Sequence, residues 1–207
     1  MPAQVAGILL AAGQGSRLGR PKATVMLGGR SLADRGVALL AEGRTAPVIV
    51  VTGAAEFEPA TGNATEVVTV KNPEWQTGMG SSLGVGLAAV PAGCAAAVIA
   101  LVDQPLVGPA SVRRLIEAFE HGATVAVACY DGKARNPVLI SREHFDAVAR
   151  LAAGSDVGAR PFLRANPGLV TEVECGDTGR PDDIDSQQDL DRIGALMAGS
   201  HSFPVKK

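Results

Sequence analysis

The chain has 207 residues and a formal net charge of −2, and 46% of its residues are hydrophobic. This length supports one sizeable hydrophobic core and is short for two, so we expect a single domain over residues 1–198 and a tail of low periodicity at 199–207. The weak negative charge argues against a general nucleic-acid-binding or anionic-membrane-binding surface. We therefore expect small-molecule partners, with no nucleic acid and no membrane.

The cysteines and the hydropathy pattern bear on the cellular compartment of the protein. Cys94, Cys129 and Cys175 are widely spaced and form no C-x-x-C pair, so they predict neither a disulfide framework nor a zinc site. No apolar run reaches the roughly 18 residues that a membrane-spanning helix needs, and the amino terminus lacks the basic and apolar regions of a secretory signal. These features predict a cytoplasmic protein.

Short apolar runs rich in β-branched residues predict the strands of the fold. Most of these runs are continuous, which is typical of parallel strands that helices cover on both faces. The predicted strands span residues 5–10, 48–52, 67–70, 97–102, 124–129, 137–140 and 170–173.

Two predicted helices are clear. One has apolar residues at helical spacing over 112–119 and ends at Gly122, and the other follows Ser186, a predicted N-cap, through 190–197. A D-G step at 131–132 predicts a hairpin between two of the strands. Strands that alternate with helices, together with this hairpin, predict an α/β fold of three layers, α/β/α, around a mostly parallel but mixed sheet.

The first predicted strand leads directly into a glycine-rich turn, L-A-A-G-Q-G-S-R-L-G-R-P-K over residues 10–22. Its glycines let the backbone take positive φ and bring N–H groups close to phosphate oxygens, while Arg17 and Lys22 supply positive charge. The turn therefore predicts a binding site for a nucleotide polyphosphate. The predicted contacts are Leu10, Ala11, Ala12, Gly13, Gly15, Ser16, Arg17 and Lys22.

Two commoner glycine-rich loops do not fit this turn. The dinucleotide fingerprint needs G-x-G-x-x-G, but the glycine that follows Gly13 and Gly15 is Gly19, one residue late. The ATPase loop needs G-K-[ST] at the start of a helix, whereas Lys22 follows Pro21. A purely structural turn with a solvated arginine remains the alternative interpretation.

Asp103 ends a buried strand and begins the string D-Q-P. A carboxylate at this position, beside bound phosphates, predicts a Mg²⁺ ligand, because Mg²⁺ favours one or two carboxylates plus phosphate oxygens and water. We assign catalytic roles to Asp103, Arg17 and Lys22. The alternative is that Asp103 only caps the turn at 104–105.

A second acidic cluster, P-D-D-I-D-S at 181–186, precedes the last predicted helix. Capping explains one of its acids but not three, so we predict a second metal ligand here. We favour Asp185 over Asp183, and we interpret Asp189 as an acid of the first helical turn.

Two further segments complete the predicted site. In the glycine-rich run at 72–87, Gly78, Ser81 and Ser82 precede an apolar helix and are predicted to contact the nucleotide, with a glycine loop and a serine N-cap as the alternative. Arg135 and Asn136 are predicted to bind the phosphorylated acceptor, and a solvated hairpin arginine is the alternative.

Together these motifs resemble the nucleotidyltransferases with a MobA-like fold over about residues 4–198. The first turn is similar to their signature L-x-x-G-x-G-x-R-M-G-x-P-K, with Leu18 in place of methionine. D-Q-P and the D-I-D-S-Q-Q-D-L of 183–190 resemble the acidic motifs, although the second lacks the usual Thr-Pro pair. Residues 72–83 are similar to N-x-x-W-x-x-G-M-x-S-S-L of the molybdenum cofactor cytidylyltransferases, and 134–137 resembles R-G-[HN]-P without its glycine.

This resemblance implies a Rossmann-like nucleotidyltransferase fold of the nucleotide-diphospho-sugar transferase type, with Mg²⁺ as the cofactor at Asp103 and Asp185. The string A-A-G at 11–13 resembles the cytidylyltransferase branch, where the guanylyltransferase branch usually has L-A-G-G. The implied reaction is transfer of CMP from CTP to molybdopterin with release of pyrophosphate. Transient contact with a molybdoenzyme or its chaperone is implied as well.

Alternatives from different classes stay open at this stage. Base choice depends on one or two small residues, so guanylyl or other nucleotidyl transfer to a different phosphorylated acceptor is the nearest alternative. A non-catalytic nucleotide-binding regulatory domain would be expected to lack a metal carboxylate, whereas Asp103 and Asp185 are both present. The glycine spacing disfavours a dinucleotide-dependent dehydrogenase.

Overall fold

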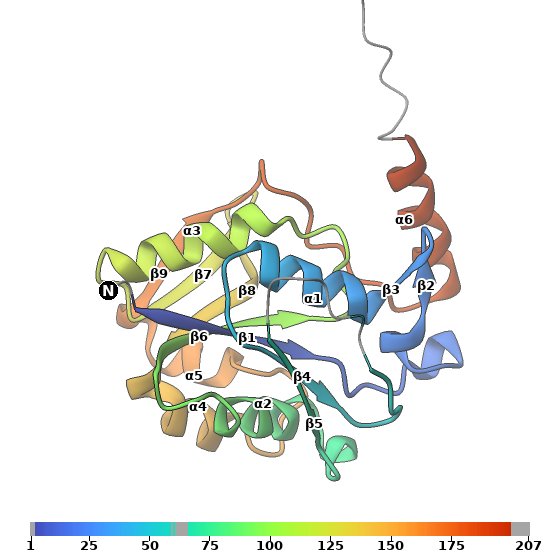
Figure 1. Cartoon of the computed structure of the whole chain (residues 1–207). Helices are drawn as coiled ribbons and strands as arrows, with labels where there is room; N and C mark the ends of the chain where they lie inside the picture. Colours follow the sequence, from blue (N-terminus) through green and yellow to red (C-terminus); the bar gives the residue numbers. More distant parts are fainter. Residues whose placement is uncertain (1–2, 59, 61–65, 200–207) are drawn as a thin grey trace, which may run out of the picture.

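The computed structural model describes residues 3–58, 60 and 66–199, and Figure 1 shows a central sheet with helices on both faces. The predicted three-layer α/β/α fold is confirmed. Of the predicted tail, Gly199 ends the last helix and residues 200–207 lie outside the described residues. The strands are β1 (Gln4–Leu10), β4 (Val48–Thr52), β5 (Val67–Lys71), β6 (Cys94–Leu101), β7 (Val125–Tyr130), β8 (Lys133–Ser141) and β9 (Val170–Glu174), with a separate hairpin of β2 (Met26–Leu27) and β3 (Arg30–Ser31).

The large sheet is mixed, with strand order β5-β4-β1-β6-β8-β7-β9. β8 runs antiparallel to its neighbours β6 and β7, and the other adjacent pairs are parallel. The predicted hairpin is confirmed, because Tyr130 pairs with Lys133 across Asp131 (φ 51°) and Gly132 (φ 69°). Positive φ at both central residues is what a type I′ hairpin turn requires.

Two strand boundaries differ from the prediction by three or more residues, and the other differences are of one residue. β6 begins three residues earlier than expected, and β8 begins at Lys133 instead of Pro137. The first residues of β8 are polar and largely exposed, yet they pair with β7 through the backbone. Hydropathy carries no signal for such residues, because strand pairing holds them and burial does not.

The helices cover the sheet in two groups. Figure 1 shows α1 and α3 on one face, α2, α4 and α5 on the other, and α6 beside the β2–β3 hairpin. The helices are α1 (Leu32–Glu42), α2 (Met79–Ala88), α3 (Pro109–Glu120), α4 (Phe145–Ala152), α5 (Arg160–Ala165) and α6 (Gln187–Gly199). Short 3-10 turns are η1 (Ser16–Leu18), η2 (Lys22–Thr24), η3 (Trp75–Thr77), η4 (Arg142–His144) and η5 (Pro167–Leu169).

A separate hydrophobic cluster fills each side of the sheet. Leu9 packs in the cluster that includes residues of α1 and α3, whereas its neighbour Ile8 packs in the cluster that includes residues of α2 and α4. Both side chains are fully buried. Successive side chains of a strand point to opposite faces, so a strand covered on both sides needs the continuous apolar run that the sequence shows.

The last helix begins as the sequence predicts. The Ser186 hydroxyl accepts a hydrogen bond from the Asp189 N–H (3.2 Å), and an Asp189 carboxylate oxygen accepts one from the Ser186 N–H (3.0 Å). This reciprocal pair is a capping box. The interpretation of Asp189 as a first-turn acid is confirmed, and the pair fixes the point at which the acidic segment 181–185 meets the helix.

The register of the two central strands sets the position of the candidate site. Leu10 at the end of β1 pairs in parallel with Leu101 at the end of β6. Ligands of such sheets bind beyond the carboxyl ends of the strands, and both chains leave the sheet there. The glycine-rich turn and Asp103 therefore emerge side by side.

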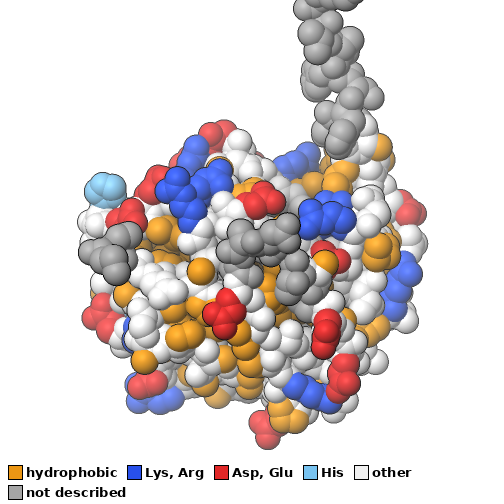
Figure 2. All heavy atoms as spheres, in the orientation of Figure 1, with side chains coloured by type: hydrophobic (Ala, Val, Ile, Leu, Met, Phe, Trp, Pro, Cys, Tyr) orange, Lys and Arg blue, Asp and Glu red, His pale blue; other side chains and the backbone are white. Residues whose placement is uncertain are grey.

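None of the helices in residues 3–58, 60 and 66–199 is long and apolar enough to cross a membrane. On the face shown in Figure 2, acidic and basic side chains are interspersed among apolar and neutral ones.

Candidate functional site

The centre of the site is a lysine held between two carboxylates. Lys22 Nζ lies 2.7 Å from Asp103 Oδ2 and 2.6 Å from Asp185 Oδ1. Burial alone would lower the pKa of Lys22, but its charge and hydrogen-bond interactions with Asp103 and Asp185 outweigh burial and raise that pKa. The ammonium therefore stays protonated, and the three predicted residues are brought together by the fold from positions up to 163 residues apart.

Asp103 has a second oxygen that its neighbours leave unsatisfied. Asp103 Oδ1 is buried and has no hydrogen-bond partner among the described residues. A buried carboxylate oxygen without a partner is costly, and a divalent cation would supply one. The residues therefore fit a divalent cation such as Mg²⁺, and Asp103 and Asp185 would be its protein ligands.

The donor set is too small for a cation cage made of protein alone. Among the described residues, no group of three or more His, Cys, Asp or Glu side chains could hold a metal ion by itself. Mg²⁺ characteristically completes its coordination with phosphate oxygens and water. A cation at Asp103 and Asp185 would thus depend on the phosphates of a bound nucleotide.

The choice between Asp183 and Asp185 has a geometric basis. The Ile184 N–H donates to the Asp103 carbonyl (2.9 Å), which anchors the acidic segment beside the end of β6. Asp185 then contacts Lys22, whereas Asp183 Oδ1 accepts a hydrogen bond from Gln104 Nε2 (2.8 Å). Partial burial raises the pKa of Asp183, and repulsion by Asp103 and Asp185 adds to this.

The glycine-rich turn follows the prediction at two of its three glycines. Gly15 (φ 62°) and Gly19 (φ 69°) take the left-handed conformation on either side of η1. The expectation was wrong for Gly13, which does not have positive φ. A Cβ added at Gly13 would meet no described atom within 4 Å, so the backbone there is open to a ligand.

Arg17 is more loosely placed than Lys22. Its Nη1 lies 3.6 Å from Asp185 Oδ2, and its side chain is 76% exposed. An exposed pair of this length contributes little to stability. Arg17 is therefore free to move toward an anionic ligand.

Two cavities meet at the carboxyl ends of β1 and β6, and we name them donor-side and acceptor-side after the substrates that the sequence predicts. The donor-side cavity, about 370 Å³, is lined by Ala12, Gly13, Lys22, Trp75, Gln76, Gly78, Ser82 and Val102 and by five residues that it shares with the second cavity. The acceptor-side cavity, about 510 Å³, includes Arg135, Asn136, Arg160 and Asp183. The shared residues are Leu10, Met79, Leu101, Asp103 and Asp156. Both volumes lie within the usual range for small-molecule sites.

Several predicted contacts lie away from the cavity surface. Ala11 is buried and donates its N–H to the Val51 carbonyl (3.0 Å). The Ser81 hydroxyl donates within its own segment, to the Gly78 carbonyl (2.9 Å) or the Glu74 carbonyl (3.1 Å). Gly78 and Ser82 do line the donor-side cavity.

The Asn72 side chain holds Ser81 and Ser82 in place. Its Nδ2 donates to Ser81 Oγ (2.9 Å) and Ser82 Oγ (3.0 Å), and the side chain is almost completely buried. The amide thus connects the end of β5 to the start of α2. The predicted contacts of these serines with the nucleotide stay predictions.

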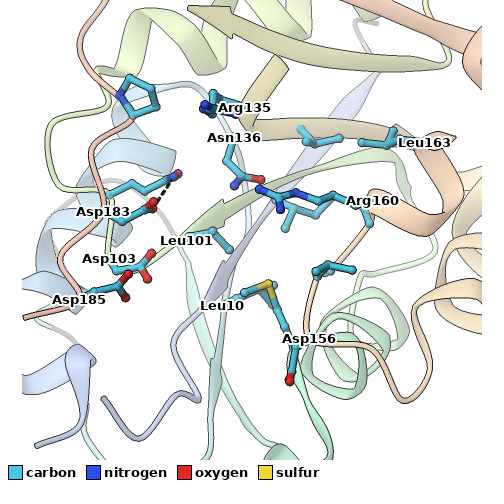
Figure 3. A pocket seen from close by; sticks show the side chains of 18 of the residues that line it. Leu10, Leu101, Asp103, Arg135, Asn136, Asp156, Arg160, Leu163, Asp183 and Asp185 are labelled. Carbon is cyan, nitrogen blue, oxygen red and sulfur yellow. Dashed lines mark hydrogen bonds between the residues drawn. The ribbon is translucent and has the colours of Figure 1, made fainter. Parts of the chain in front are cut away.

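Figure 3 shows the acceptor-side cavity with three carboxylates at one end, the arginines apart from them, and the Asp156 carboxylate at a separate position. Asp103, Asp183 and Asp185 lie together, and Arg135, Asn136 and Arg160 lie apart from them. The sequence motifs do not contain Arg160 or Asp156, and Gln104 lies in the D-Q-P motif without a predicted role. Arg160 and Asp156 lie on or beside a short loop between helices, where neither a strand end nor a glycine-basic string marks them.

Comparison with known proteins identifies the family. Residues 7–170 match the MobA-like NTP transferase domain. The chain belongs to the MobA-like NTP transferase family. Nicotine blue oxidoreductase of Paenarthrobacter nicotinovorans is 36% identical over 197 residues, which cover 91% of this chain and 96% of that protein.

Two solved structures are similar to this chain in fold. The Mycobacterium tuberculosis rv0371c homolog from Mycobacterium sp. strain JC1 has a TM-score of 0.80 and 29% identity, over 97% of this chain and 100% of that one. Rv0371C of Mycobacterium tuberculosis H37Rv, solved in complex with manganese, has a TM-score of 0.73 and 26% identity, over 93% and 99%. The chain is thus a nucleotidyltransferase of the MobA-like family, and a protein of similar structure binds a divalent metal.

Proposed function

We propose that the protein transfers CMP from CTP to a phosphorylated acceptor, molybdopterin carrying molybdenum, and releases pyrophosphate. One observation carries the proposal. Asp103 lines both cavities, and its buried Oδ1 has no partner among the described residues. A carboxylate shared by a donor-side and an acceptor-side cavity can hold a cation that contacts the phosphates of both substrates.

The chemistry needs positioning and charge more than it needs a base. An oxygen of the acceptor phosphate attacks the α-phosphorus of the triphosphate, the bond to the β-phosphate oxygen breaks, and pyrophosphate leaves with that electron pair. A phosphomonoester has a second pKa of about 6, so the attacking group is mostly dianionic at neutral pH. The side chains therefore act by orientation and neutralisation.

Each predicted residue has a specific task in this scheme. Lys22 and Arg17 bind the α-phosphate and the departing pyrophosphate, and the amides beside Gly13 and Gly15 approach the same phosphates. Asp103 and Asp185 would hold Mg²⁺, which neutralises phosphate charge when it is bound. Arg135 and Asn136 bind the acceptor.

Cytosine is the proposed base because of the segment at 11–13. The A-A-G string resembles the cytidylyltransferase branch, and Ala12 and Gly13 line the donor-side cavity. The test is to incubate the purified protein with each of the four ribonucleoside triphosphates, Mg²⁺ and molybdenum-loaded molybdopterin, and to measure pyrophosphate release. CTP consumption is expected, and GTP consumption with CTP left unused would overturn the choice of base.

The name of the 36% identical relative favours a second candidate, an oxidoreductase that acts on nicotine blue. Such a reaction requires an electron donor and gives the Asp103–Lys22–Asp185 contact no direct task. An assay for reduction of nicotine blue by NADH or NADPH separates the two candidates. The loss of nicotine blue absorbance measures this reduction. Reduction that persists in Asp103→Asn, without pyrophosphate release from any triphosphate, would favour the oxidoreductase.

A further inference from the structure

The acceptor-side cavity contains a second arginine that no motif assigns. Arg135 comes from β8, and Arg160 is the first residue of α5, so two elements from separate parts of the chain contribute the basic end of this cavity. Figure 3 shows the Arg160 side chain reaching into the cavity toward Asn136. The cavity floor between the arginines and the carboxylates is apolar and includes Leu101, Ile99 and Val138.

The charges at the two ends of the cavity are balanced differently. At the acidic end, Lys22 contacts both Asp103 and Asp185 and offsets one of their two negative charges, and Asp182 pairs with Arg180 and Arg192 (2.9 Å each). At the basic end, neither Arg135 nor Arg160 forms an ion pair with a carboxylate in the described part of the chain. The basic end is therefore where the cavity can accept an anion.

The backbone before Arg160 is held against the donor side. The Ser155 carbonyl accepts a hydrogen bond from the Gly80 N–H (2.8 Å) at the start of α2, and the Val157 carbonyl accepts one from the Arg160 N–H (3.2 Å). The loop packs so closely that a Cβ added at Gly80 would overlap the Ala152 carbonyl. The backbone of Arg160 is thus fixed in position relative to the donor-side cavity.

We propose that Arg160 is an acceptor-binding residue that, together with Arg135, holds the phosphate of the acceptor between α5 and β8. This inference rests on the proposed function and names a residue that its motifs omit. Guanidinium groups bind phosphate through two parallel N–H donors, which fixes orientation as well as position. With arginines on one side and the Asp103 end on the other, the acceptor phosphate is oriented toward the donor-side cavity.

Inorganic phosphate is a suitable probe, because its binding can be measured by calorimetry on the full chain without any turnover. Arg160→Ala is expected to weaken phosphate binding about tenfold, the usual size of a lost charge-assisted hydrogen bond, and Arg160→Lys to weaken it less. Arg164→Ala is the matched control, because Arg164 lies one turn further along α5, is exposed and does not line the cavity. It is expected to bind phosphate like the wild type.

The donor-side turn could also bind phosphate, and Arg17→Ala distinguishes that source. Phosphate binding that disappears in Arg17→Ala and is unchanged in Arg160→Ala would overturn the proposal. If the protein turns over CTP, Arg160→Ala should also raise the KM for the acceptor and leave the KM for CTP within about twofold. Loss of phosphate binding in Arg160→Ala without any CTP turnover in the wild type would support the anion site and count against the cytidylyl reaction only.

Discussion

The donor-side and acceptor-side cavities share Asp103 but differ in how their charges are satisfied. On the donor side, Lys22 is mostly buried, with 15% of its side chain exposed, and it contacts carboxylates at 2.6 and 2.7 Å. On the acceptor side, Arg135 and Arg160 are exposed and form no ion pair with a described carboxylate. On the donor side a lysine is paired with carboxylates, whereas the arginines of the acceptor side have no carboxylate partner among the described residues.

This difference indicates the order of events at the donor side. Lys22 Nζ contacts the same two carboxylates that we propose as metal ligands, so the ammonium and a divalent cation compete for them. The phosphates of a nucleotide offer Lys22 new partners and give the cation its remaining ligands. We therefore expect the metal and the nucleotide to bind together, whereas the acceptor side needs no such exchange.

The largest effect is expected at the residue that both cavities share. Asp103→Asn keeps the shape of the side chain and removes its charge, so catalysis should fall by about 10²–10³, the usual result of removing one charge-stabilising group. The measurement is pyrophosphate release from the best triphosphate at saturating Mg²⁺. Asp191→Asn on the exposed face of α6 is the control, and near-normal turnover by Asp103→Asn would contradict the assignment.

Lys22→Met tests the difference in charge pairing between the two cavities. Removing the ammonium leaves Asp103 and Asp185 close together with only the exposed Arg17 near Asp185, so the variant should unfold at a lower temperature in chelator than the wild type does. Added Mn²⁺ should then raise its Tm more than it raises the Tm of the wild type, because binding to the native state stabilises in proportion to affinity. Mn²⁺ binding no stronger than in the wild type would show that lysine and metal do not compete.

A pair of glycine variants separates the architecture of the donor-side turn from its ligand contact. Gly15 has φ 62°, and a Cβ there would overlap the Arg20 carbonyl, so Gly15→Ala should lower the free energy of unfolding by about 1–3 kcal/mol. Gly13→Ala meets no described atom within 4 Å and should leave stability unchanged while it weakens triphosphate binding. Chemical denaturation and calorimetry report the two effects, and equal loss of stability in both variants would contradict the distinction.

The smallest effect concerns Asp183, at the acidic end of the acceptor-side cavity. Its folded-state pKa is raised above 3.8, so the folded chain binds this proton more tightly than the unfolded chain does. Stability attributable to this group is therefore present at low pH and is lost as the pH rises from about 3.8 through the raised pKa. Asp183→Asn keeps a side-chain oxygen that can accept the hydrogen bond from Gln104. Because asparagine does not ionise, the variant avoids this loss of stability.

The expected result is a Tm at neutral pH that is higher than that of the wild type by no more than a few degrees. The difference should shrink as the pH is lowered toward 3.8. Thermal unfolding followed by circular dichroism over this pH range measures it. A lower Tm at neutral pH would mean that ionised Asp183 has a stabilising partner.

The donor side was predicted more completely than the acceptor side for a physical reason. Its turn is one continuous string in which local backbone geometry and basic residues coincide, and the positive φ of Gly15 and Gly19 follows from residue type. Gly13 was the exception, because glycine can take positive φ but is not required to. The acceptor-side cavity combines residues of β8, α5 and the loop before it, so no single segment carries its signature.

Local sequence alone determined the alternation of strands and helices, the D-G hairpin and the capping box at Ser186 and Asp189, and it predicted a phosphate-binding site at Arg17, Lys22 and Asp103. These features depend on backbone preferences and on neighbours within a few residues. Only the tertiary structure decided that Lys22 contacts Asp185 and that Arg160 faces Asn136. Such contacts depend on strand order, register and helix packing, because residues far apart in the chain become neighbours only through those long-range arrangements.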